Sequence, residues 1–348
     1  MSVFLSLIKK EALHILRDRR TVAVTVIMPL VLLLLFGFAI STEVNNVRIV
    51  VAADGYDDRT HEIMERIDAN GYFTLLGLAA PREAETMLRK GEADALLVLR
   101  PDAGKLAAQI MLDASNPVVS QAAGAYITAV VDGSSDSVIL SRTLYNPQLK
   151  SAYNFVPGIM GMIFILICAI MTSVSIVNEK ESGSMDLLLI SPVRPGWVVF
   201  GKLVPYFILS CTILAVMLVM AYTVLGLPSS GSIMTVIAVS LLYIVLSLSV
   251  GLLVSTLVSN QVSALIVSAV LFMIPVIMLS GMIFPIDNMP APLQWLSGVI
   301  PARWYIAALR KLMIQQLGVG AVIEEVVILA VMTAAILGLA VKNFNSKR

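Results

Sequence analysis

Residues 155–177 have the sequence FVPGIMGMIFILICAIMTSVSIV, a run of 23 amino acids without an acidic or basic side chain. A helix of this length reaches about 34 Å, which exceeds the ~30 Å hydrocarbon thickness of a bilayer. Apolar side chains dominate every side of such a helix, so lipid rather than water is the solvent that it requires. The run therefore predicts a transmembrane helix.

Five further runs have the same character. The first follows a long charged leader and exceeds the ~7–15 apolar residues of a signal peptide, so we expect a permanent helix. The last run has only 16 residues and needs Ile323 onward to span the membrane. The five runs are Thr21–Ile40, Leu203–Leu227, Ile233–Val258, Val262–Ile283 and Val326–Val341. Together with residues 155–177 they predict six transmembrane helices.

The composition agrees with a membrane protein. Hydrophobic residues make up 58% of the chain and charged residues 14%, with a mean hydropathy of +0.90, whereas soluble domains are about 45–50% apolar and about 25% charged. The net charge of +1, without a basic tract, gives no reason to expect a nucleic-acid partner. Both cysteines, Cys168 and Cys211, lie inside apolar runs, which excludes a disulfide framework and a thiol-ligated zinc site outside the membrane. We predict no metal site and no cofactor in this chain.

Residues 1–20 precede the first run and predict a cytoplasmic amphipathic interface helix. Its apolar side chains (Phe4, Leu5, Ile8, Ala12, Ile15 and Leu16) fall on one side, and its basic ones (Lys9, Lys10, Arg17 and Arg20) fall largely on the other. A helix of this kind suits an anionic membrane surface.

The segment 41–152 has a different character, because it holds 25 of the 47 charged residues of the chain. Strand-like and helix-like stretches alternate along it, which predicts a small α/β domain with a partly parallel sheet. The expected strands are 47–53, 72–78, 93–99 and 107–113, and the expected helices are 58–70, 82–90 and 117–144.

Lysine and arginine in the short loops predict the orientation. The termini and short loops on the same side as the N-terminus carry eleven of these residues. The short segments on the opposite side carry three, Arg303, Arg310 and Lys311. The set of eleven is Lys9, Lys10, Arg17, Arg19, Arg20, Lys180, Arg194, Lys202, Lys342, Lys347 and Arg348. We therefore expect both termini in the cytoplasm and the α/β domain outside, in a multi-pass protein of a bacterial inner membrane.

The sequence offers no internal source of energy for transport. No acid or base interrupts the runs from Phe155 to Ile283, although ion-coupled transporters usually carry ionisable groups at membrane depth. A phosphate loop of the form G-x-x-x-x-G-K-[ST] is absent. With only His14 and His61 available, a catalytic triad inside the membrane is implausible, which argues against an intramembrane enzyme. Uphill transport would need a second subunit.

The loop after the second run carries the most informative motif, NEKESGSMDLLLISPVRP at residues 178–195, followed by GKLVPY at 201–206. Ser184 can cap a short helix, Asp186 suits its first turn, and Pro192 ends it. The four apolar residues 187–190 then form a surface that either lies in the bilayer interface or docks on a partner. The plainer alternative is a connecting loop whose acids are solvated.

These residues resemble the signature of ABC type-2 transporter permeases, E-[KR]-E-x-G-[ST]-x-x-x-L-L-x-[ST]-P followed by G-K-x-x-P. The opening KKEALHILRDRR at 9–20 and the segments GMIFPIDNMP at 281–290 and IPARWY at 300–305 are similar to other parts of the family pattern, so the resemblance covers the whole chain. Asp186 departs from it, because many members have Glu in this stretch. The matching residues are Glu179, Lys180, Glu181, Gly183, Ser184, Leu187, Leu188, Ser191, Pro192, Gly201, Lys202 and Pro205.

The resemblance implies a permease subunit of an ATP-driven exporter. Its partners would be a cytoplasmic ATP-binding subunit, which holds the ATP and Mg²⁺, and a second permease copy in a homo- or heterodimer; a periplasmic adaptor is a further candidate. The cytoplasmic loop 178–202 would be the coupling element. Its expected coupling residues are Glu179, Glu181, Gly183, Ser184, Leu187, Leu188, Pro192, Gly201 and Lys202.

The region 284–316 contains two short helical stretches separated by prolines. The resemblance implies a pair of re-entrant outer gate helices, and the alternative is an interfacial loop anchored by aromatic and arginine side chains. The expected gate residues are Pro285, Pro290, Trp295, Pro301, Arg303 and Trp304.

The predicted fold is thus an α-helical membrane protein with six transmembrane helices, an N-terminal interface helix, re-entrant outer helices and an extracytoplasmic α/β domain between helices 1 and 2. The α/β domain could bind substrate, dock a partner or cover the exit.

We expect hydrophobic or amphipathic cargo, such as a drug or lipid, to move between two copies. Two roles are open for the hydroxyl side chains in the runs, lining of this path or hydrogen bonding between helices; they are Ser210, Thr212, Ser247, Ser249, Ser255 and Thr256. The rival interpretation is a membrane-anchored receptor or structural protein.

Overall fold

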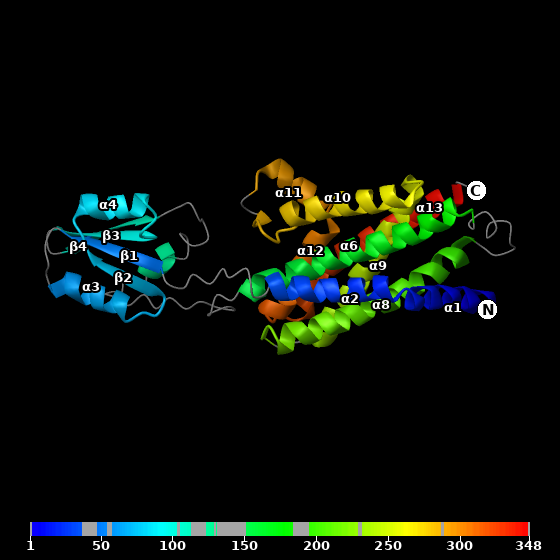
Figure 1. Ribbon diagram of the computed structural model, residues 1–348, viewed down its shortest axis with the longest axis horizontal. Coiled ribbons are helices and arrows are strands. Elements are labelled where there is room, and N and C mark those ends of the chain that lie inside the picture. The colour runs from blue at the N-terminus through cyan, green and yellow to red at the C-terminus, as the bar shows by residue number, and fades with distance from the viewer. Residues whose placement is uncertain are drawn as a thin grey trace. The chain divides into compact units, whose positions relative to one another are not determined.

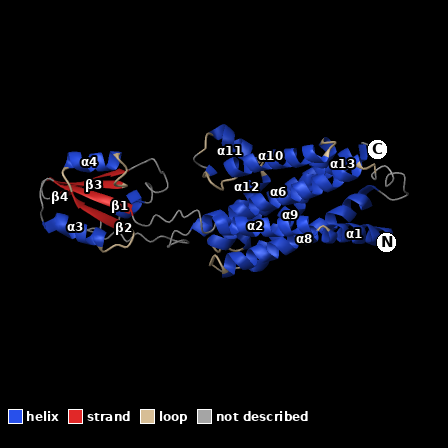
Figure 2. Ribbon diagram, viewed as in Figure 1, coloured by secondary structure: helices blue, strands red, loops and turns tan. Residues whose placement is uncertain are grey.

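The structure is a computed structural model of the full chain, and it describes residues 2–36, 47–53, 58–102, 105–112, 123–128, 130, 151–183, 195–228, 232–286 and 289–346. The chain divides into two compact units. One comprises residues 1–40 and 151–348 and is helical, and the other comprises residues 41–150 and contains a sheet (Figure 2). The units are described separately below.

The helical unit consists of long helices that run side by side, with shorter helices near one end of the bundle (Figure 1). Its long helices are α1 (Ser2–Arg17), α2 (Arg19–Leu34), α6 (Ser151–Glu181), α8 (Pro195–Thr223), α9 (Ile233–Leu257), α10 (Gln261–Leu279) and α13 (Ile323–Ser346). The shorter elements are α11 (Ala291–Gly298), α12 (Pro301–Leu309), the π-helix η3 (Arg310–Ile314) and the 3₁₀ turn η4 (Val319–Val322).

Within the described part of the chain, five helices are long and apolar enough to cross a membrane. They are Phe155–Glu181, Phe200–Thr223, Ile233–Leu257, Gln261–Leu279 and Val319–Asn343. The first predicted transmembrane helix, 21–40, corresponds to the shorter apolar stretch Val22–Leu34 and continues into residues outside the described part of the chain. The structure therefore contains a multi-span helical membrane unit, and a sixth crossing stays a prediction.

Local sequence explains where several helices begin and end. The predicted helix over residues 3–20 is divided at Asp18, which separates α1 from α2. Ser232 caps α9 by accepting a hydrogen bond from the backbone of Thr235, and Asn260 caps α10 by accepting one from Ser263 at 2.7 Å. These caps satisfy amide groups that would otherwise lack a partner at a helix start.

Helix α6 lies at the centre of the bundle and packs against α2, α8, α9, α10 and α12. Its contact with α9 is close because Gly251 has no side chain. A Cβ atom at that position would lie 2.7 Å from the carbonyl oxygen of Ala169 and 2.8 Å from Cβ of Thr172. Small residues allow membrane helices to approach in this way, since packing rather than water drives their association.

The second unit contains a four-stranded mixed sheet. Its described elements are β1 (Val47–Ala53), α3 (Asp58–Asp68), β2 (Phe73–Leu78), α4 (Pro81–Arg89), β3 (Ala95–Asp102) and β4 (Lys105–Leu112). The strand order is β2-β1-β3-β4, in which β1 is parallel to both β2 and β3, and β4 is antiparallel to β3. Helices α3 and α4 cover opposite faces of the sheet (Figure 2). Of the predicted helix 117–144, residues 123–128 and 130 are described, and these are helical.

One ion pair connects two strands of this sheet. The guanidinium of Arg48 donates to both carboxylate oxygens of Asp94, at 3.0 and 2.8 Å, and the backbone amide of Arg48 donates to the same carboxylate. The hydrogen bonds and charge of Arg48 outweigh partial burial and lower the pKa of Asp94. The pair therefore fixes the start of β1 beside β3 at neutral pH.

We expect Gly251→Ala to destabilise the helical unit by about 2 kcal/mol, because the added methyl group meets the backbone of α6. Thermal unfolding of the purified full-length protein in detergent measures this loss. Gly338→Ala in α13 is the matched control, since a Cβ there meets nothing within 4 Å. Equal unfolding temperatures for the two variants would contradict the close α6–α9 contact.

Candidate functional site

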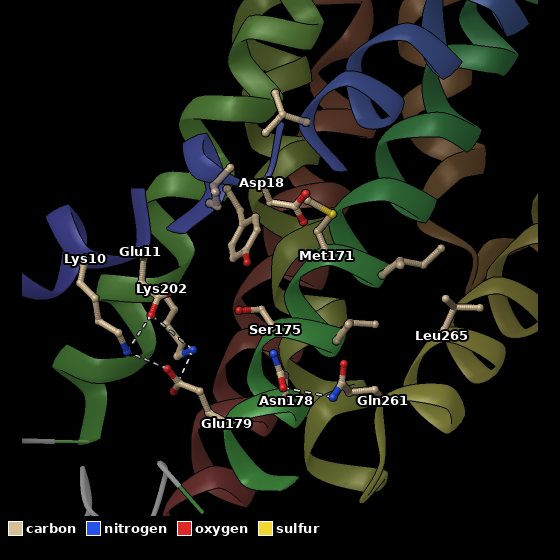
Figure 3. Close-up of a pocket in the computed structure, with 15 residues that line it drawn as sticks. Lys10, Glu11, Asp18, Met171, Ser175, Asn178, Glu179, Lys202, Gln261 and Leu265 are labelled. Carbon is tan, nitrogen blue, oxygen red and sulfur yellow. Dashed lines mark hydrogen bonds and ion pairs between the residues drawn. The ribbon is translucent and has the colours of Figure 1, made fainter. Parts of the chain in front are cut away.

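Four charged side chains from three helices form an ion cluster at one end of the bundle, in which Glu11 and Lys202 are buried and Lys10 is exposed (Figure 3). Glu179, in the last turn of α6, lies 2.8 Å from Nζ of Lys202 in α8 and 3.1 Å from Nζ of Lys10 in α1. Glu11 of α1 lies 3.7 Å from Lys202 and 3.5 Å from Lys10. We call these four residues the ion cluster.

Burial makes the ion cluster energetically important. Lys202 is only 5% exposed and Glu11 only 4%. A charge removed from water this completely must be paired, because its desolvation costs several kcal/mol. Partial burial lowers the pKa of Lys10, but the hydrogen bond and charge of Glu179 outweigh it, so the net shift raises that pKa. The cluster therefore holds α1, α6 and α8 together.

A second polar contact lies beside the cluster and involves α10. The side-chain amide of Gln261 donates to Asn178 at 3.1 Å and to the carboxylate of Glu181 at 2.7 Å. Lys180 donates to the backbone carbonyl of Ser255 at the end of α9. Residues 178–181 thus connect the end of α6 to four other long helices: α1, α8, α9 and α10.

The structure brings some of the predicted coupling residues together and leaves others outside its described part. Glu179 and Lys202 are in direct contact, with Gly201 buried next to Lys202. Glu181 is exposed, and Gly183 has a φ of +70°, a left-handed conformation that favours glycine at the end of α6. Ser184, Leu187, Leu188 and Pro192 lie outside the described residues.

Sequence reasoning missed Lys10 and Glu11 as members of the site. Lys10 was placed on the basic face of the interface helix, and Glu11 was left unassigned. The available signal was the spacing of Glu11 and Ile15, which are one helical turn apart and are both buried. An acid on the inward side of an amphipathic helix requires a buried base, but the sequence does not say which one.

The predicted outer-gate residues lie in and around α11 and α12. Pro290 immediately precedes α11, Pro301 is the first residue of α12, and Pro285 is exposed in the preceding loop. Prolines at these positions start helices without the loss of a backbone hydrogen bond. Trp295 is 83% exposed, so it has no buried contact within the subunit.

Arg303 and Trp304 connect the two short helices. The Arg303 guanidinium donates to the carbonyl oxygen of Gln294 and to the hydroxyl of Ser297, and the Trp304 indole donates to the carbonyl oxygen of Gly298, at 2.9, 2.5 and 2.9 Å respectively. The guanidinium also lies over the Trp304 ring, 4.9 Å from its centroid. These bonds hold α11 and α12 as one hairpin.

Two buried tyrosines attach α12 to the centre of the bundle, a contact that the sequence analysis did not predict. The rings of Tyr305 and Tyr243 are stacked with centroids 4.1 Å apart. The hydroxyl of Tyr305 lies 2.9 Å from that of Ser240 in α9, and the Tyr243 hydroxyl donates to the carbonyl of Gly161 in α6. The hairpin is therefore fixed through α12 rather than through its exposed tryptophan.

The hydroxyl residues considered for a transport path are mostly buried within the subunit. Ser247, Ser249, Ser255 and Thr256 are almost inaccessible and donate to carbonyl oxygens of their own helix. Ser210 is also buried, 3.2 Å from Cys168, and only Thr212 is exposed. Except at Thr212, this burial favours a role in helix packing over the lining of a path. Among the described residues, no group of three or more histidine, cysteine or acidic side chains could hold a metal ion.

Comparisons with known proteins agree on one family. The model of the family described as "ABC-2 family transporter protein" matches residues 19–342. The chain is similar to the "Probable multidrug ABC transporter permease YbhR" of Escherichia coli strain K12, with 28% identity over 98% of both chains. It is also similar to "YbhS" of the same strain, a "Probable multidrug ABC transporter permease", with 26% identity over 87% of this chain and 86% of the relative. "ABC transporter G family member 20" of Dictyostelium discoideum is 29% identical over 54% of this chain and 25% of its own.

We expect Glu179→Gln to destabilise the protein by about 3 kcal/mol, because it leaves the buried Lys202 without its closest carboxylate. The double variant Glu179→Gln/Lys202→Gln should lose less than the sum of the two single variants, since it removes both charges. Thermal unfolding in detergent gives the four stabilities. Glu324→Gln, which changes an exposed acid at the start of α13, is the control; additive single effects would contradict the ion cluster.

Tyr305→Phe should cost about 1 kcal/mol, because it removes the hydroxyl bonded to Ser240 in the bundle core. Trp295→Ala, in the same outer hairpin, should leave the unfolding temperature unchanged because Trp295 is exposed. The opposite order of the two effects would show that the hairpin is held by its tryptophan.

Proposed function

The chain belongs to the ABC-2 family of transporter proteins, and we propose that it draws its driving force from a separate cytoplasmic ATP-hydrolysing subunit that holds ATP and Mg²⁺. The chain is a permease subunit of an ABC exporter, as its family and relatives indicate. The sequence supplies no phosphate loop of its own. If a separate ATPase supplies the energy, it must act on this chain through a cytoplasmic surface, and we assign that surface to the region around residues 178–202.

The ion cluster supports this role for the loop 178–202. Glu179 lies in the last turn of α6 and Lys202 lies near the start of α8, so the two ends of the loop are joined by a 2.8 Å contact. A force applied between these ends acts on α6, the helix that packs against most of the bundle. We propose that Glu179, Glu181, Gly183, Ser184, Leu187, Leu188, Pro192, Gly201 and Lys202 transmit motion of the ATPase to the helices.

We further propose the arrangement of the subunit in its membrane. Both termini lie in the cytoplasm of a bacterial cell, six helices cross the inner membrane, and the α/β domain faces outward. The distribution of lysine and arginine supports this orientation. Two permease copies pair, as a homo- or heterodimer, and α11 and α12 form a re-entrant outer gate with Pro285, Pro290, Trp295, Pro301, Arg303 and Trp304. A periplasmic adaptor is a further candidate partner for the outward domain.

We propose a hydrophobic or amphipathic cargo, such as a drug or lipid. The relatives from Escherichia coli are named multidrug permeases, and the transmembrane runs from Phe155 to Ile283 contain no acid or base that would solvate a simple ion. Membership of this family does not by itself identify the transported molecule.

Copurification from native membranes tests the proposed partner. We expect an ATP-binding protein in stoichiometric amount with the affinity-tagged full chain. Glu181→Lys should reduce its recovery by about tenfold, because it reverses a charge on the exposed end of α6. Deletion of residues 183–190 should abolish the recovery of the ATP-binding protein completely.

The control for this experiment is Glu324→Lys, an exposed acid at the start of α13, which should leave the recovery unchanged. A permease that purifies without any ATPase, from cells whose drug or lipid export does not change on its deletion, would contradict the exporter and support the receptor or structural alternative.

A further inference from the structure

Arg310 is a basic residue whose charge has no counter-ion among the described residues. It lies where α12 passes into η3, and its side chain is half-buried. A guanidinium carries five N–H donors, but within the described part of the chain this one makes a single hydrogen bond, from Nη2 to the carbonyl oxygen of Met282, at the long distance of 3.4 Å. Its Nε is buried and has no partner there. A charge in this position has lost water without a replacement, which favours the binding of an anion.

The other two basic side chains of residues 300–311 are satisfied within the subunit. The Arg303 guanidinium donates to two oxygen atoms of α11, at 2.9 and 2.5 Å. Nζ of Lys311 lies 2.5 Å from the carboxylate of Glu325. Arg310 differs from both, because most of its donors are left for a ligand.

The depth of Arg310 in the bundle matches the level of lipid headgroups. Met282, which accepts its hydrogen bond, fills the space that a side chain at Gly158 would need. Gly158 is the fourth residue of the uncharged run 155–177, whose length of about 34 Å only slightly exceeds the ~30 Å hydrocarbon core. The guanidinium therefore lies near the boundary between hydrocarbon and headgroups, where lipid phosphates are found.

Exposed apolar side chains lie on both sides of Met282 along the chain. Val270, Ile274 and Met278 are about half-exposed and follow one another at intervals of four residues, so they form one stripe along α10. Ile283, directly after Met282, is 45% exposed. A guanidinium next to such a surface suits a ligand with an anionic head and long apolar chains.

We propose that Arg310 binds the phosphate of an anionic phospholipid whose acyl chains lie along this stripe of α10. A guanidinium can donate two parallel hydrogen bonds to phosphate oxygens. Access to Nη1 is not blocked by a side chain at Gly281, where an added Cβ would lie 3.9 Å from that atom. Placement of the lipid in the outward leaflet rests on the proposed orientation of the subunit, whereas binding itself does not.

A small inorganic anion fits this place less well than a lipid. It would use the charge of Arg310 and leave the apolar stripe without a partner, whereas a phospholipid supplies both the anion and the chains. An internal carboxylate is the other alternative. Asp287 belongs to the same loop and lies outside the described residues, so it is included among the variants below.

Phosphatidylglycerol and phosphatidylcholine test the anionic head, because they can carry the same acyl chains and differ in net charge. Native mass spectrometry of the delipidated full-length protein in detergent measures the affinity for the first bound lipid. We expect phosphatidylglycerol to bind about tenfold more tightly, and Arg310→Gln to lose this preference. Arg310→Lys should retain part of it, because lysine keeps the charge but not the paired donors. Lys342→Gln, which removes an exposed lysine near the other end of α13, should change nothing.

The stability of Arg310→Gln without lipid separates a ligand site from an internal ion pair. In lipid-free detergent the variant should unfold at the same temperature as the unmodified protein or higher, because it removes an uncompensated charge. Only the stabilisation by added phosphatidylglycerol should disappear. Asp287→Asn should leave the affinity for phosphatidylglycerol unchanged.

Three results would overturn the proposal: equal affinities for the two lipids, an unchanged preference in Arg310→Gln, or a loss of stability in lipid-free Arg310→Gln that is coupled to Asp287→Asn. Displacement of phosphatidylglycerol by excess inorganic phosphate would also overturn it, since free phosphate would then be the ligand. Failure of the proposed function looks different. In that case the chain would copurify with no ATPase, while lipid binding and its dependence on Arg310 would persist.

Discussion

A lysine that is almost wholly buried near the end of a membrane helix needs a carboxylate within contact distance, because neither lipid nor the packed core solvates its charge. Lys202 is in this position, and Glu179 lies 2.8 Å from it. Glu179 lies in the last turn of α6 and Lys202 lies near the start of α8, so their pairing requires that α6 and α8 meet at this end of the bundle. Lys10 and Glu11 extend the requirement to α1, which would otherwise have only its apolar side to hold it in place.

The opposite part of the helical unit is held by a different interaction. Tyr305 and Tyr243 are stacked in the core, and each hydroxyl group has a partner on another helix. A buried tyrosine needs such a partner because its hydroxyl loses water on burial. The two short helices α11 and α12 are then joined by Arg303 and Trp304 through carbonyl oxygens and one hydroxyl. One end thus depends on charge pairing, and the other depends on aromatic packing with neutral hydrogen bonds.

The sequence predicts the parts of this structure that depend on local pattern. Long uncharged runs predicted α6, α8, α9, α10 and α13, with ends that differ by at most eight residues, and alternating strand-like and helix-like stretches predicted the four strands of the sheet. The family motif singled out Glu179 and Lys202. Long-range pairing was not predictable: Lys10 lies 169 residues from Glu179 along the chain, and its place on an amphipathic helix is equally compatible with a lipid headgroup. The burial of Ser247 and Ser255 was likewise undetermined, because a hydroxyl that lines a path and one that bonds its own helix look the same in a sequence.

The ion cluster also lines a cavity of about 500 Å³ among α1, α2, α6, α8 and α10. Glu179 contributes to the cluster at the end of α6 and also lines the cavity, together with Lys10, Glu11 and Lys202. A movement of the loop that follows Glu181 would change the distance between α6 and α8 and, with it, the pairing of Lys202. Because Lys10 and Glu11 contact Glu179 and Lys202, such a change would act on α1 as well.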